Sequence, residues 1–65
     1  MTRYTTHTVQ GREYMVWSDT TTRATYAQDL GSLEMRRIYG GGYITNDLTI
    51  RKAIANKFGL KSFRK

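Results

Sequence analysis

The sequence has no cysteine, a single histidine and only five acidic residues among its 65 positions. Without thiols the chain can form neither disulfide bonds nor thiolate metal sites. His7 and the scattered carboxylates show no spacing typical of a metal centre or a catalytic pair, and the serines 18, 32 and 62 belong to no nucleophile motif. We therefore expect no catalytic residues, no metal and no cofactor, and a protein that is not an enzyme.

Long hydrophobic runs are also absent, since no apolar stretch approaches the roughly 20 residues needed to span a bilayer. The first residues lack the charged-then-apolar pattern of a signal peptide, so we expect a cytoplasmic protein without a membrane span. The apolar fraction of 38% is low, and a chain this short buries only about 60% of the surface that its unfolded form exposes. We expect a thin core that gains stability from self-association as a homo-oligomer or from a bound partner.

Positive charge is present, and it is concentrated at the C-terminal end. The formal net charge is +6. Before Arg51 five basic residues balance five acidic ones, whereas from Arg51 onward there are six basic residues and no acid. A neutral body with a basic end predicts a surface that holds an anionic partner. We expect one domain over residues 1–60 and a short basic tail over residues 61–65.

The most clearly signalled element is a helix over residues 47–58. Thr45 or Asn46 can cap its first turn. Gly59 suits the left-handed residue just past a helix, and Leu60 can fold back onto the helix. Apolar residues recur every three or four positions and define a broad side expected to be buried: Leu48, Ile50, Ala53, Ile54, Ala55 and Phe58.

A β-hairpin is predicted near the N-terminus. Residues 3–9 and 12–17 are rich in threonine, aromatic and β-branched side chains, and Gln10-Gly11 between them suits a tight turn. A two-residue turn would pair Tyr4 with Trp17, and a bulged three-residue loop is the alternative. With the two-residue turn, one face carries Tyr4, Thr6, Thr8, Glu13, Met15 and Trp17, and the other carries His7, Val9, Tyr14 and Val16. The large Tyr4 and Trp17 pair leads us to expect the first face to be buried.

Residues 23–39 fit two patterns, after a turn predicted at residues 18–22. As strands, residues 23–29 and 33–39 flank a turn at residues 30–32. As helices, Gly31 ends one short helix and Gly40 ends another, which Ser32 would cap. The threonine-rich start of this stretch favours strands.

In the helical alternative, residues 27–31 (Ala-Gln-Asp-Leu-Gly) resemble the first helix and turn of the helix-turn-helix motif. In that family a small residue stands four positions before the turn glycine, and a buried aliphatic residue follows six positions after it. Here Arg37 occupies the second position, and Ile38 comes one residue later. The resemblance covers about a quarter of the chain, and it implies two short helices in place of strands.

The triple glycine at residues 40–42 is expected to connect the last strand to the helix. No Lys-Ser or Lys-Thr pair follows it, which argues against a phosphate-cradling loop. We therefore predict an α+β fold, with an N-terminal β-hairpin extended to a small three-stranded antiparallel sheet and packed against one C-terminal amphipathic helix. The alternative is the hairpin with short helices like those of the helix-turn-helix motif.

These features together predict a small basic nucleic-acid-binding protein, with DNA expected over RNA, that contacts phosphates through its C-terminal helix and tail without catalysis. The residues expected to contact nucleic acid are all cations: Arg36, Arg37, Lys52, Lys57, Lys61, Arg64 and Lys65. The alternative is an inhibitor or adaptor that docks an acidic protein surface through the same basic end and through aromatic side chains of the sheet.

Overall fold

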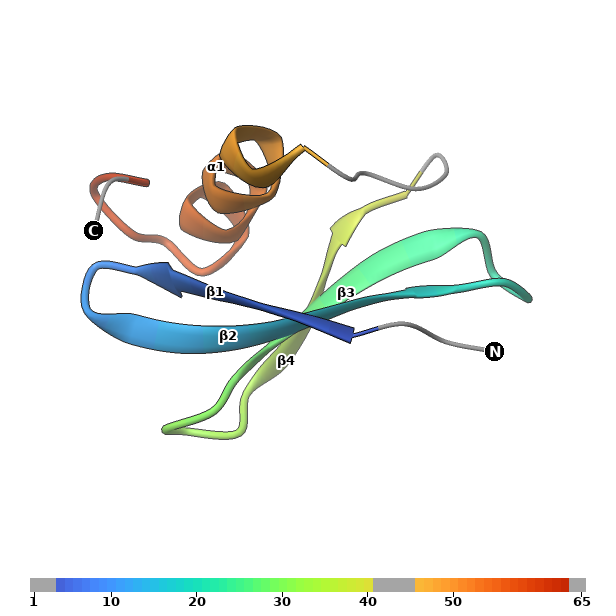
Figure 1. Ribbon diagram of the computed structural model, residues 1–65, viewed down its shortest axis with the longest axis horizontal. Helices are drawn as coiled ribbons and strands as arrows, with labels where there is room; N and C mark the ends of the chain where they lie inside the picture. Colours follow the sequence, from blue (N-terminus) through green and yellow to red (C-terminus); the bar gives the residue numbers. More distant parts are fainter. Residues whose placement is uncertain (1–3, 41–45, 64–65) are drawn as a thin grey trace.

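The computed structural model describes residues 4–40 and 46–63, which form four β-strands followed by one α-helix (Figure 1). The elements are β1 (Tyr4–Val9), β2 (Arg12–Asp19), β3 (Ala24–Asp29), β4 (Met35–Tyr39) and α1 (Asp47–Lys57). The strands form one antiparallel sheet in the order β1-β2-β3-β4, so each strand pairs with its neighbours in sequence. The α+β class is confirmed, although the sheet has four strands rather than the three expected.

The β1–β2 hairpin closes through a two-residue turn. Gln10 and Gly11 have φ angles of 55° and 74°, the positive values that a type I′ turn requires. This turn pairs Tyr4 with Trp17, Thr6 with Met15 and Thr8 with Glu13. The register predicted for a two-residue turn is therefore confirmed.

The sheet buries the face opposite to the one expected. α1 lies across the face that carries Val9, Tyr14 and Val16, and all three are buried (Figure 1). Tyr4, on the other face, is 59% exposed. The expectation was wrong because the position of α1, and not the size of the Tyr4 and Trp17 pair, decides which face is buried: Ile50 and Ile54 of the helix join Val9, Tyr14 and Val16 in one core cluster. The core cluster draws on all four strands and the helix: Val9, Tyr14, Val16, Ala27, Ile38, Ile50 and Ile54.

Residues 23–39 form strands, so the helix-turn-helix alternative is wrong. Gly31 lies in the turn between β3 and β4 and ends no helix. Ile38 is 3% exposed and packs in the core from β4, next to a shift in the β3–β4 register. Gly40 follows β4 directly, whereas the rest of the predicted glycine connector, residues 41 and 42, lies outside the described residues.

The helix follows the sequence signals closely. The Asn46 side chain accepts a hydrogen bond from the Thr49 N–H at 3.1 Å, and α1 ends one residue before Phe58. The Leu60 N–H donates to the Ala55 carbonyl at 2.8 Å across Gly59, whose φ is +71°. Contrary to expectation Leu48 is 51% exposed, because the buried side is narrower and centres on Ile50, Ile54 and Ala55. No helix among the described residues is long and apolar enough to cross a membrane.

Candidate nucleic-acid interface

The exposed lysines gather on α1 and the turn that follows it. Lys52 and Lys57 belong to the helix, and Lys61 follows two residues after Gly59. All three side chains belong to exposed residues, and none forms an ion pair with an acid in the described part of the chain. We call these lysines, together with Arg36 beside the end of α1, the basic surface.

Most acidic side chains accept hydrogen bonds in turns or form ion pairs with arginines. The Asp19 carboxylate accepts from the Thr21 N–H at 2.7 Å and so closes the β2–β3 turn. Three other acids form ion pairs with arginines: Asp29 with Arg12 at 3.1 Å, Glu34 with Arg36 at 2.7 Å and Asp47 with Arg51 at 3.0 Å. Among the described residues no carboxylate forms an ion pair with Lys52, Lys57 or Lys61, although Glu34 is paired with Arg36 within the basic surface.

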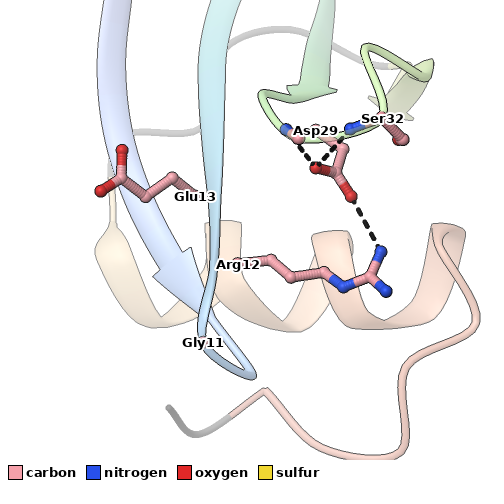
Figure 2. Close-up of a pocket in the computed structure, with 6 residues that line it drawn as sticks. Gly11, Arg12, Glu13, Asp29 and Ser32 are labelled. Atoms are coloured by element: carbon pink, nitrogen blue, oxygen red, sulfur yellow. Dashed lines mark hydrogen bonds and ion pairs between the residues drawn. The ribbon is translucent and has the colours of Figure 1, made fainter.

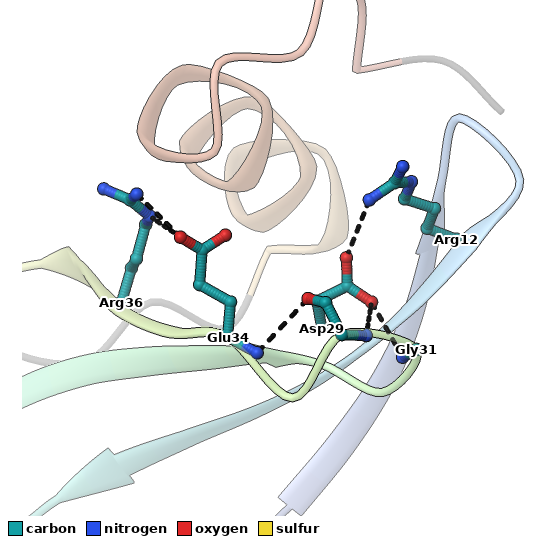
Figure 3. Close-up of polar contacts among 6 residues, drawn as sticks. Arg12, Asp29, Gly31, Glu34 and Arg36 are labelled. Atoms are coloured by element: carbon teal, nitrogen blue, oxygen red, sulfur yellow. Dashed lines mark hydrogen bonds and ion pairs between the residues drawn. The ribbon is translucent and has the colours of Figure 1, made fainter.

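Arg36 and Arg37 lie on opposite sides of β4, because successive residues of a strand alternate between faces. Arg36 lies over the Phe58 ring, 5.8 Å from its centroid, and Glu34 accepts from its guanidinium (Figure 3). Arg37 pairs with Tyr26 and lies on the face that α1 leaves open. The structure therefore places Arg36 beside Phe58 at the end of α1 and Arg37 on the opposite face of the sheet.

The beginning of the C-terminal tail packs back toward α1. The Lys52 ammonium lies 5.3 Å from the centroid of the Phe63 ring, close enough for a cation–π contact. Phe63 is half-buried, so its ring holds the start of the tail against α1. The predicted contact residues Arg64 and Lys65 lie outside the described residues.

His7 links β1 to the first turn of α1. Its Nδ1 donates to Oδ1 of Asp47 at 2.6 Å, and its Nε2 lies 2.8 Å from the Thr5 hydroxyl. The hydrogen bond from His7, helped by Arg51, lowers the pKa of the Asp47 carboxyl below its usual value. Nδ1 therefore joins the helix to the sheet, whereas Nε2 contacts Thr5 within the same strand.

Asp29 and Arg12 line an open hollow between the β1–β2 and β3–β4 turns (Figure 2). Arg12 points toward Asp29, whereas Glu13 points to the other side of β2. Burial opposes ionisation of Asp29, but hydrogen bonds from the Gly31 and Ser32 N–H groups and from Arg12 outweigh it and lower its pKa. The carboxylate thus stabilises the β3–β4 turn through these hydrogen bonds.

The described residues contain no group of three or more histidine and acidic side chains placed to hold a metal ion. Burial, reinforced by nearby Asp29, raises the pKa of the Tyr14 hydroxyl, so this phenol stays protonated at neutral pH. Comparisons with protein-family models, curated proteins and solved structures find no match to this chain.

The open face of the sheet is a second candidate surface, which the sequence did not predict as a site. The Tyr4 and Trp17 rings lie 6.0 Å apart, and Trp17 stacks on Tyr26 with centroids 5.8 Å apart and planes at 25°. These rings form a row across three neighbouring strands that ends at Arg37 on β4. The hairpin register already placed Tyr4 and Trp17 together; what the sequence did not reveal was which face the helix would cover.

Proposed function

We propose that this chain is a small, non-catalytic nucleic-acid-binding protein that contacts phosphates through the basic surface of α1. The observation that supports it best is the exposure of Lys52, Lys57 and Lys61, none of which pairs with a carboxylate in the described ranges 4–40 and 46–63. Lysines arranged this way neutralise phosphates and release counterions, which gives affinity that falls steeply with salt. We favour DNA over RNA, and a cytoplasmic location is part of the same proposal.

The basic surface suits phosphate contacts better than base reading. Lys57 and Lys61 act as point charges on flexible side chains, whereas Lys52 lies against the Phe63 ring and the guanidinium of Arg36 is held by Glu34 and by the Phe58 ring. Phosphate contacts carry no sequence information directly. We therefore expect weak discrimination between sequences and a strong dependence on ionic strength.

The test is a titration into fluorescent single- and double-stranded DNA and RNA at about 50 and 200 mM salt. Replacing all three lysines (K52Q/K57Q/K61Q) should weaken binding at the lower salt by at least about tenfold and reduce the salt slope by roughly three, or about one per lost phosphate contact. The charge-preserving variant K52R/K57R/K61R should retain both the affinity and the slope.

A matched pair of single substitutions tests the location of the contact. K57Q and R23Q each remove one exposed charge, but Arg23 lies in the β2–β3 turn rather than on α1. K57Q should weaken binding several-fold more than R23Q, and equal losses would overturn the assignment to α1. Failure of wild-type protein to bind any oligonucleotide at the lower salt would overturn the proposal altogether and direct attention to an acidic protein surface.

A further inference from the structure

The open face of the sheet has the composition of a protein interface rather than of a phosphate-binding surface. Cross-strand pairing builds two adjacent rows: Tyr4, Trp17, Tyr26 and Arg37 in one, and Thr6, Met15, Gln28 and Met35 in the next. Tyrosine, tryptophan, methionine and arginine are enriched in protein–protein interfaces, and lysine is depleted there. Neither row contains a lysine.

The distribution of charge makes a second copy of the chain a suitable occupant of this face. Each copy carries a formal charge of +6, so two copies repel each other over most of their surfaces. The two rows differ from the rest of the surface, because Arg37 is their only charged residue. The helix α1 and its lysines lie on the other side of the sheet (Figure 1). Two copies that meet at their open faces place both basic helices outermost, where separation and solvent reduce the repulsion.

Covering the exposed apolar side chains of this face would also stabilise the protein. Tyr4 is 59% exposed and Met35 is 57% exposed, at opposite edges of the sheet. Between them, Met15, Trp17 and Tyr26 remain half-buried. A domain this small has a limited core of its own, so burying these side chains against an identical face adds stability that the isolated chain lacks.

We propose that the open face of the sheet is a self-association surface through which two copies of this chain form a symmetric dimer. With strands spaced about 4.8 Å apart and a rise of about 3.3 Å per residue, a face four strands wide and five residues long, the length of β4, spans roughly 320 Å². That area is smaller than the roughly 800 Å² per partner of a standard stable interface. The dimer should therefore be reversible, with dissociation in the micromolar range.

The dimer is tested by sedimentation equilibrium of the protein alone, without nucleic acid. Wild-type protein should change from monomer to twice the monomer mass as its concentration rises through the micromolar range. Raising the salt from about 50 to 500 mM should strengthen the dimer, because ions screen the repulsion between two chains of the same charge. Nucleic-acid binding responds to salt in the opposite direction, so failure of either proposal is recognised independently of the other.

Met35→Lys and Leu48→Lys form a matched pair of variants. Each adds one positive charge at an apolar side chain that is about half exposed, 57% for Met35 on the open face and 51% for Leu48 on α1. Because both positions are exposed, both variants should fold, which circular dichroism checks. M35K should raise the dimer dissociation constant at least tenfold, whereas L48K should change it by no more than about twofold.

Two results would overturn the self-association proposal. One is wild-type protein that stays monomeric up to a concentration on the order of 100 μM, well above the micromolar dissociation constant expected for so small an interface. The other is an equal weakening by L48K and M35K, which would reflect net charge and not the open face. If the wild type is monomeric and M35K instead weakens oligonucleotide binding, the occupant of this face is nucleic acid.

Discussion

Asp29 ends β3 with its carboxylate inside the turn that leads to β4 (Figure 3). One oxygen accepts from the Gly31 N–H at 2.8 Å, and the other accepts from Arg12 at 3.1 Å. The side chain is 4% exposed, so these hydrogen bonds replace the water that burial removes. A single acid thus fixes the turn and joins it to the neighbouring hairpin through Arg12.

Replacing Asp29 by alanine should lower the free energy of unfolding by about 2 kcal/mol at neutral pH, because the N–H groups of Gly31 and Ser32 and the Arg12 guanidinium lose their shared acceptor. Asp19→Ala provides the control, since Asp19 also caps a turn but forms no ion pair with an arginine among the described residues. We expect a smaller loss for D19A in urea denaturation. Equal losses would show that the Arg12 contact and burial add nothing.

The contribution of Asp29 should also depend on pH. Its pKa in the folded protein lies below the ordinary value of 3.8, so the unfolded chain takes up the proton more readily as the pH falls. The stabilisation is fully present above the ordinary pKa and is lost as the pH falls through the folded pKa. The stability difference between wild type and D29A should therefore be constant between about pH 5 and 7 and shrink below about pH 4. A difference that grows on acidification would contradict this assignment.

At the level of the elements, α1 depends on how its C-terminal end is closed. Gly59 adopts a φ of +71°, a conformation that costs a residue with a side chain roughly 1 to 2 kcal/mol. Gly59→Ala should destabilise the protein by about 1 kcal/mol in urea denaturation. Asn56→Ala, an exposed position within the same helix, should be neutral or slightly stabilising because alanine favours helix. Equal effects of the two variants would exclude a role for the left-handed turn.

The elements that the sequence predicted correctly have strong local signals. The cap at Asn46, the apolar period and the stop at Gly59 all lie within α1 or next to it. Gln10-Gly11 likewise fixes the hairpin register through its own backbone geometry. The number of strands was underestimated because residues 23–39 also fit a helical pattern, although their threonine-rich start favoured strands, and pairing with β2 resolves them.

Properties that depend on packing between elements could not be predicted from local signals. Both faces of the first hairpin carry large apolar side chains, so the buried face is decided by α1, which is distant in sequence. For the candidate site, the exposure of Lys52 and Lys57 was predictable from helical periodicity, whereas Lys61 lies beyond the helix. The separation of Arg36 from Arg37 followed from strand alternation only after residues 35–39 were known to form a strand.

At the scale of the whole molecule, self-association should be visible in thermal stability. Dimerisation stabilises the folded state by mass action, so the melting temperature should rise by a few degrees for each tenfold increase in protein concentration. The melting temperature of M35K should be nearly independent of concentration. Scanning calorimetry over two decades of concentration measures both, and a constant melting temperature for the wild type would contradict the dimer.

The strand order also determines how the chain can fold. Every strand pairs with its neighbour in sequence through a short turn, so the sheet can grow hairpin by hairpin, each step closing only a short loop and proceeding on the microsecond scale. The contact between His7 and Asp47, by contrast, joins residues 40 positions apart. Docking of α1 therefore closes the longest loop, and we expect it to complete folding by covering a sheet that is already paired.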